Sequence, residues 1–222
     1  FGGRLLRRFF LILIVFHQLE AAHRTGSHTV LPFFRGGVGF RAVFLVTGGS
    51  LGAQVLGERV ADLAKWEIAQ RDFLHVHATG SIEKADFAAL AARLGIDHSP
   101  KFIIREYIDN MPQCLSAADL VIGRAGAMTL TEIEAKAKAS ILIPSPNVAE
   151  NHQFHNAMAL VRRGAAEIIE EKDLTGEALW EKVRAILSDP GRLQSLGENA
   201  GKMEVLDASD RIYRVIKSAA AK

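Results

Sequence analysis

The sequence predicts an α/β fold in which helices cover both faces of a parallel sheet. From Val43 onward, short runs of β-branched and aromatic residues alternate with longer segments of helical periodicity, a pattern typical of βαβ units. Two of the predicted strands end in glycine-containing turns that lead directly into a helix. The chain has 222 residues, of which 49% are hydrophobic and 23% charged, as expected for a globular protein that buries a core.

The predicted elements follow one another in regular order. A strand at Val43–Thr47 ends in the glycine turn Gly48–Ala53, and residues 52–69 show the period of an amphipathic helix. A strand at Phe73–Ala78 precedes a helix at Glu83–Leu94 that ends at Gly95. Further strands are predicted at Lys101–Glu106, Leu120–Ile122, Ser140–Ile143 and Ala165–Glu170. Further helices are predicted to begin near Ala127 and to cover residues 151–163, 176–187, 191–203 and 208–217.

The first 42 residues do not share this pattern. An unbroken apolar run, Phe9–Phe16, follows a cluster of arginines and is much shorter than the roughly 20 residues that span a bilayer. Three interpretations stay open: a signal peptide without a clear small-residue cleavage site, an interfacial segment or remnant strand, and out-of-frame translation. We therefore expect an irregular or out-of-frame segment at residues 1–42 and one domain at residues 43–222.

Charge and cysteine content exclude some classes of function. A net charge of +2 is too small to indicate a nucleic-acid partner. The single cysteine, Cys114, cannot form an internal disulfide, and no neighbouring residue would lower its pKa, so we expect a small buried residue there. His75 and His77 alternate along a predicted strand, and we expect both to be structural.

The turn after the first strand carries three glycines. Gly48, Gly49 and Gly52 would let the backbone approach a phosphate closely, and Ser50 could donate its hydroxyl to a phosphate oxygen. The turn matches neither the GxGxxG fingerprint nor a P-loop. Because glycines at such a turn can also serve sterics alone, this segment leaves both interpretations open.

A second glycine turn, Gly123–Gly126, follows the fourth strand. The backbone N–H groups of Ala127, Met128 and Thr129 would be free at the start of the next helix and would favour an anion. Glu132 lies too far along that helix to cap it, but it could accept hydrogen bonds from a ribose diol. The alternative is a solvated surface glutamate. Arg124 could pair with a phosphate or with a neighbouring carboxylate.

The loop after the fifth strand ends in polar side chains. Pro144 and Pro146 stiffen it, and a helix then opens with residues that suit sugar hydroxyls, above all Gln153. His152 and His155 have a spacing that could bind a metal ion, but no further Cys, His or Asp is well placed beside them. We therefore expect no metal ion here.

Three separated segments resemble the MurG family. They are GGSLGA (Gly48–Ala53), the stretch from Glu106 to Ile133, and the stretch from Ser140 to Leu160, and they occur in the family's order within residues 43–217. The family transfers N-acetylglucosamine from UDP-GlcNAc to the lipid-linked muramoyl-pentapeptide of bacterial peptidoglycan, converting lipid I to lipid II at the cytoplasmic face of the cell membrane. The resemblance implies the C-terminal, Rossmann-like half of a GT-B glycosyltransferase. No counterpart of the family's N-terminal half, which carries the expected catalytic base, is found.

The resemblance also implies roles for individual residues. Ser50 would contact the diphosphate beside the glycines of its turn. Ile108 would place its backbone against uracil, with Met111 nearby. Glu132 would bind the ribose hydroxyls. The remaining implied contacts are Ala127, Met128 and Thr129 with the phosphates, His152 and Gln153 with the sugar, and Asn156 with the loop itself.

The resemblance implies an inverting transfer with no cofactor. The implied partners are UDP-GlcNAc, a lipid-linked acceptor and the membrane surface as a peripheral contact, with no nucleic acid. Two alternatives stay open: a UDP-sugar-binding fragment without activity, and a UDP-sugar epimerase of similar fold, for which Glu150 would be the nearby carboxylate. One departure stands near the site, because Ala137-Lys138-Ala139 replaces the family's Gly-Lys-Pro.

Overall fold

The computed structural model describes residues 42–49, 53–69, 73–99 and 101–220, which form a six-stranded sheet with helices on both faces. The spatial order of the strands is β3-β2-β1-β4-β5-β6, and each neighbouring pair is parallel. The predicted fold class is therefore confirmed. The strands are β1 (Ala42–Thr47), β2 (Phe73–Ala78), β3 (Phe102–Arg105), β4 (Leu120–Gly123), β5 (Ala139–Leu142) and β6 (Glu167–Ile168).

Helices connect the strands and extend beyond the last one. They are α2 (Gln54–Ala69), α3 (Lys84–Leu94), α4 (Met111–Ala117), α5 (Ala127–Ala135), α6 (His152–Val161), α7 (Gly176–Leu187), α8 (Pro190–Gly201) and α9 (Ala208–Ala220). Two 3-10 turns, η2 (Ala149–Asn151) and η3 (Glu171–Asp173), precede α6 and α7.

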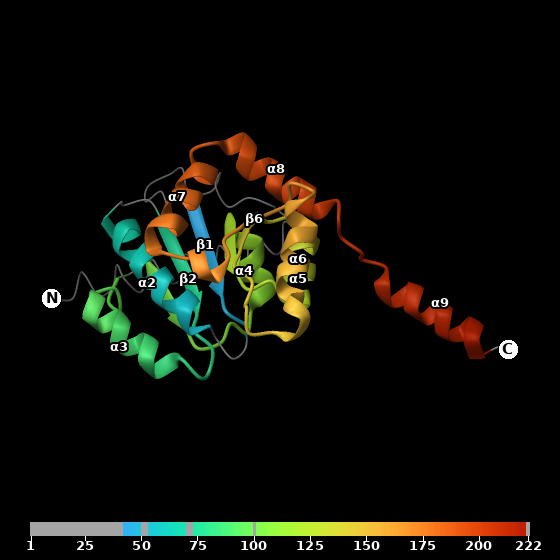
Figure 1. Cartoon of the computed structure of the whole chain (residues 1–222), viewed down its shortest axis with the longest axis horizontal. Helices are drawn as coiled ribbons and strands as arrows, with labels where there is room; N and C mark the ends of the chain where they lie inside the picture. The colour runs from blue at the N-terminus through green and yellow to red at the C-terminus, as the bar shows by residue number, and fades with distance from the viewer. Residues whose placement is uncertain (1–41, 50–52, 70–72, 100, 221–222) are drawn as a thin grey trace.

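Each face of the sheet has its own apolar core. Alternate side chains of β1 point to opposite faces, so Phe44 packs with residues of α2, α3 and α7, whereas Leu45 packs with residues of α4, α5 and α6. Figure 1 shows the same division, with α2, α3 and α7 on one side of the strands and α5 and α6 on the other. Burial on both faces explains why a central strand such as β1 is apolar along most of its length.

The carboxyl ends of the strands meet at one edge, which positions the site. Thr47 at the end of β1 pairs with Gly123 at the end of β4, and Gly123 pairs in turn with Leu142 of β5. The chain builds outward from β1 through β2 and β3 on one side, and from β4 through β5 and β6 on the other. Between β1 and β4 the strand order reverses, and open α/β sheets bind ligands at such a point.

Several predicted boundaries need correction. The predicted strand Ser140–Ile143 lies one residue earlier, at Ala139–Leu142, and the predicted strand Ala165–Glu170 shortens to Glu167–Ile168. No helix was predicted at α4, because its seven residues are too few to show a period and Pro112 stands in its first turn. The expectation for residues 1–42 falls almost entirely outside the described residues.

The buried polar residues behave as structural groups. Cys114 is buried, as expected, and burial raises the pKa of its thiol to about 11. The charge of Arg105 opposes this shift, which corrects the expectation that no neighbouring residue would lower the pKa. His75 and His77 lie among Phe44, Phe87 and Phe102. Burial, reinforced by the neighbouring His75, lowers the pKa of His77 to about 3, so this imidazole is neutral in the folded protein.

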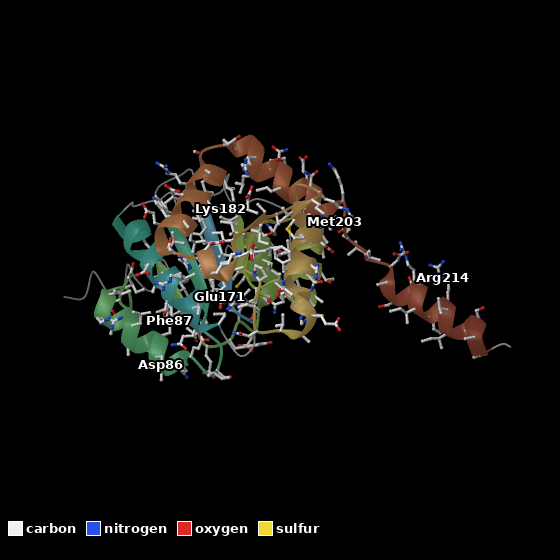
Figure 2. The ribbon with its side chains drawn as sticks, viewed as in Figure 1. Asp86, Phe87, Glu171, Lys182, Met203 and Arg214 are labelled. Atoms are coloured by element: carbon white, nitrogen blue, oxygen red, sulfur yellow. The ribbon has the colours of Figure 1, made fainter. Side chains whose placement is uncertain are left out.

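Helix α9 stands apart from the rest of the domain. Figure 1 shows it beyond the end of α8, and Figure 2 places its Arg214 far from Met203, where the body of the domain ends. None of its residues is buried. Within the described part of the chain, no helix is both long and apolar enough to cross a membrane.

Candidate functional site

The two glycines of the turn between β4 and α5 have different physical reasons. A Cβ on Gly123 would lie 2.7 Å from the carbonyl oxygen of Thr47, so only glycine permits the close pairing of β4 with β1. Gly126 is the residue before α5, with φ −71° and ψ 148°, which any residue adopts. A Cβ there would meet nothing within 4 Å. Within the described residues, a side chain at position 126 would therefore meet no close neighbour.

Contacts from several elements hold this turn in place. The Arg124 backbone N–H donates to the Thr47 carbonyl oxygen (3.4 Å), and its Nη1 donates to the Ile143 carbonyl oxygen (3.2 Å). The Arg124 guanidinium also forms an ion pair with Glu171, so the arginine pairs with a carboxylate. Asn156 Nδ2 on α6 donates to the Ala125 carbonyl oxygen (3.1 Å). The turn is thus fixed before any ligand arrives.

The N-terminus of α5 is an open set of donors. The first N–H groups of a helix have no acceptor within the helix, and Gly126 has no side chain that could cap them. Ala127 and Met128 are exposed, and Met128 leaves 75% of its surface in contact with solvent. This end of the helix can therefore receive an anion.

Glu132 lies on the same helix and is half-buried. Burial raises the pKa of its carboxyl group. Among the described residues, no side chain donates a hydrogen bond to it, whereas a partly desolvated carboxylate is stabilised by donors. Hydroxyl groups of a ligand lying along α5 would supply them.

Hydrogen bonds between side chains and the backbone order the loop from β5 to α6. Gln153 Oε1 accepts a hydrogen bond from the Ser145 backbone N–H (3.0 Å), which leaves its amide NH₂ group to donate. His152 Nδ1 lies 2.9 Å from the Ala149 carbonyl oxygen. Because a carbonyl only accepts, Nδ1 carries a proton, and in the neutral tautomer Nε2 is left to accept. Glu150 and Asn151 both have φ near +50°, a strained pair at the start of α6.

The residues expected near uracil follow β3. Ile108 is buried and packs in the core below α4 and α5, so its backbone rather than its side chain faces outward. Met111 begins α4 and is half-buried. These two residues, the α5 start and the α6 start all follow carboxyl ends of strands, so the structure places their loops at one edge of the sheet.

The first glycine turn differs from the second. Gly49 has φ +91°, a conformation that favours glycine, and its N–H donates to Thr47 Oγ1 (3.2 Å). Residues 50–52 of this turn, which include Ser50 and Gly52, lie outside the described residues. Partial burial raises the pKa of Glu83, while the nearby backbone N–H groups of Ala53 and Gln54 and the charge of Arg124 oppose the shift. An internal carboxylate therefore already faces the start of α2.

Sequence reasoning missed Glu83 and Glu171. Both lie on connections that follow strands, β2 and β6, yet nothing in the sequence states which donors or cations they face.

A cleft of about 490 Å³ lies between α2 and α3, and Glu83 is one of the residues that line it. Its charged lining residues are Glu58, Arg59, Asp62, Glu83, Asp86 and Arg93. None of the residues expected to bind a nucleotide lines this cleft. Within the described residues, no group of three or more His, Cys, Asp or Glu could hold a metal ion.

Comparison with known proteins gives consistent matches. Residues 43–212 match the glycosyltransferase family 28 C-terminal domain. The chain is 40% identical over 173 residues to the UDP-N-acetylglucosamine–N-acetylmuramyl-(pentapeptide) pyrophosphoryl-undecaprenol N-acetylglucosamine transferase of Acetivibrio thermocellus. That alignment covers 78% of this chain and 46% of the relative. The chain thus spans about half the length of the curated relatives it matches.

Solved structures agree on the fold. The crystal structure of Acinetobacter baumannii MurG superposes with a TM-score of 0.70 at 27% identity, over 84% of this chain and 52% of that one. A putative UDP-N-acetylglucosamine 2-epimerase from Listeria monocytogenes superposes with a TM-score of 0.62 at 15% identity, over 83% of this chain and 46% of that one. At such low identity, the second likeness concerns the fold alone.

Proposed function

The chain belongs to glycosyltransferase family 28, whose C-terminal domain it matches, and on that premise we propose that it binds the sugar-nucleotide donor UDP-GlcNAc. One observation carries the proposal: α5 presents an uncapped N-terminus behind a glycine turn, and farther along the same helix the Glu132 carboxylate accepts no hydrogen bond from a described residue. A nucleoside diphosphate carries both groups that these features would bind: a diphosphate for the helix N-terminus and a ribose diol for the carboxylate. The similarity to MurG proteins supports the choice of uracil and N-acetylglucosamine.

In this proposal each part of the donor has its own contact. The N–H groups of Ala127, Met128 and Thr129 bind the diphosphate, and Glu132 accepts hydrogen bonds from the ribose hydroxyls. The Ile108 backbone meets uracil, with Met111 beside it. The Gln153 amide and His152 Nε2 meet the sugar, while Asn156 supports the turn. The contact proposed for Ser50 belongs to the turn outside the described residues.

The chemistry proposed is an inverting glycosyl transfer. A hydroxyl of the lipid-linked acceptor attacks the anomeric carbon of N-acetylglucosamine as the bond to UDP breaks. The N–H groups at α5 stabilise the negative charge that develops on the leaving diphosphate, which is electrostatic catalysis by fixed dipoles. The base that takes the acceptor's proton is proposed to belong to the half of the relatives that this chain does not match. Peripheral contact with the cytoplasmic face of the membrane follows from a lipid-linked acceptor.

Calorimetric titration tests the donor-binding proposal. We expect UDP and UDP-GlcNAc to bind and to compete with one another, and uridine to bind far more weakly because it lacks the phosphates. Absence of UDP binding at millimolar concentration would overturn the proposal. UDP release in the presence of UDP-GlcNAc and acceptor lipid separates a competent enzyme from a binding fragment. The epimerase alternative predicts release of UDP or an epimerised sugar without acceptor.

A further inference from the structure

Arg124 lies in the turn that precedes the proposed phosphate site, and its side chain contacts Ile143 and Glu171 rather than solvent. It follows β4 and lies two residues before Gly126. Its side chain is 12% exposed and that of its partner Glu171 is 15% exposed, so water screens the ion pair little. Figure 2 shows Glu171 in the middle of the domain.

The contacts of Arg124 tie the turn to three strands. Its backbone N–H binds the carbonyl at the end of β1, its Nη1 binds the Ile143 carbonyl just beyond β5, and its Nη2 binds Glu171 just beyond β6. The planar guanidinium can make the hydrogen bond to Ile143 and the ion pair with Glu171 together because its donors have a fixed fork geometry. Glu83 is a second carboxylate whose pKa feels the charge of Arg124. If the Arg124 side chain turned toward a bound phosphate, it would lose its contacts with Ile143 and Glu171.

We infer that Arg124 is a positioning residue for the donor diphosphate, and that its ion pair with Glu171 holds the turn before α5 so that the first N–H groups of the helix are aimed at the phosphates. This inference rests on the proposed function. The arginine itself stays paired with Glu171 when the donor binds. Its positive charge adds to the local field without touching the ligand.

A direct role for Arg124 makes the opposite prediction about Glu171. If Arg124 bound a phosphate, Glu171 would compete for it, and removing the Glu171 charge would strengthen UDP binding. If the ion pair positions the turn, removing that charge loosens the turn and weakens UDP binding. The sign of the change in affinity therefore separates the two roles.

The experiment uses the full chain with the substitutions Glu171→Gln and Arg124→Lys. We expect each to weaken UDP binding about three- to tenfold and to leave uridine binding unchanged, because only the phosphate contacts depend on the turn. The matched control is Lys182→Gln, which breaks the 2.8 Å pair with Glu167 away from the turn. We expect this control to leave UDP binding unchanged.

Hydrogen exchange provides a readout that needs no ligand. We expect faster amide exchange across residues 123–129 in Glu171→Gln than in the wild type, and no such change in Lys182→Gln. Unchanged exchange at these amides, or tighter UDP binding by Glu171→Gln, would overturn the positioning role. A wild-type chain that binds no UDP would contradict the proposed function instead, and the exchange result would still decide whether Arg124 orders the turn.

Discussion

The N-termini of α2 and α5 make an instructive comparison. Both helices follow a strand at the carboxyl edge of the sheet, and a glycine turn precedes each of them. At α2, the nearby backbone N–H groups of Ala53 and Gln54 act to lower the pKa of the Glu83 carboxyl, so an internal carboxylate lies beside this helix start. At α5, the preceding residue is Gly126, and no atom of the described part of the chain lies within 4 Å of where its Cβ would be.

The difference shows that a helix N-terminus is available to a ligand only where no internal anion reaches it. The dipole and the orphan N–H groups are common to all helices. The start of α5 differs in its surroundings. Hydrogen bonds made by Arg124 and Asn156 hold the preceding turn, and neither side chain caps the first N–H groups of the helix. We therefore place the donor diphosphate at α5. The predictions below test this assignment in order of decreasing effect.

Replacing Glu132 by Ala should have the largest effect. Losing a carboxylate that accepts hydrogen bonds from two hydroxyls removes about 2 kcal/mol, or roughly 30-fold in UDP affinity. Titration calorimetry with UDP and with 2′,3′-dideoxy-UDP measures this. The wild type should lose affinity for the dideoxy analogue, whereas the variant should bind both equally. Equal affinity of the wild type for both ligands would remove the ribose role.

The same carboxylate predicts a pH dependence of UDP binding. Burial raises the pKa of Glu132, and only the ionised form accepts hydrogen bonds from both hydroxyls. Affinity should therefore be full at neutral pH and should fall as the pH drops through this raised pKa, above the usual value near 4.3 for glutamate. The Glu132→Ala variant should lack this step. The same step in both proteins would assign it to another group.

Gly126→Ala should weaken UDP binding about tenfold while changing the free energy of unfolding by less than about 1 kcal/mol. The added methyl group meets no atom of the residues that the structure describes, and the backbone angles suit alanine, so we expect a bound ligand to contact it. Gly123→Ala is the contrasting variant, since its Cβ would collide with the Thr47 carbonyl and lower stability. Denaturant unfolding and calorimetry measure the two quantities. Unchanged UDP affinity in Gly126→Ala would place the phosphates elsewhere.

Glu83→Gln should tighten UDP binding by about threefold. It removes a negative charge from the carboxyl edge and relieves repulsion of about 0.7 kcal/mol, as expected for one charge near a helix terminus. It should also lower thermal stability, because the start of α2 loses an ionised acceptor. Weaker UDP binding in this variant would mean that the α2 terminus takes part through Glu83.

Ala137→Gly should change stability alone. Ala137 follows α5 with φ +50°, a conformation that glycine adopts without steric cost, and the MurG-like sequences suggest glycine there. We expect a gain of about 0.5 kcal/mol in the free energy of unfolding, since relief of strain is partly offset by backbone entropy. UDP affinity should stay the same, because this end of α5 lies away from the proposed site. A loss of UDP affinity would show that the two ends of α5 are coupled.

The fold could be predicted from the sequence because local signals agree with one another. Apolar β-branched runs mark strands such as Val43–Thr47, and the left-handed Gly95 ends α3 as expected. The short helix α4 was missed because seven residues do not establish a period, and β6 was overestimated because Ala165 and Ala166 are buried without joining a strand. Packing, rather than local preference, decides both.

The site could be predicted only in part. The glycine turns pointed to strand ends, and parallel strands bring those ends to one edge. Whether a helix start is open to a ligand depends on carboxylates from distant loops. Glu83 lies beside the start of α2, and Glu171 pairs with Arg124 in the turn before α5. No local pattern in the sequence reports such contacts. This is why the starts of α2 and α5 look alike in the sequence and differ in the structure.

Amide chemical shifts of ¹⁵N-labelled protein during a UDP titration test the central claim most directly. If the donor diphosphate binds at α5, the amides of Ala127, Met128 and Thr129 shift strongly with UDP and little with uridine. Shifts confined to Ala53 and Gln54, or equal shifts at α5 with UDP and uridine, would contradict the account.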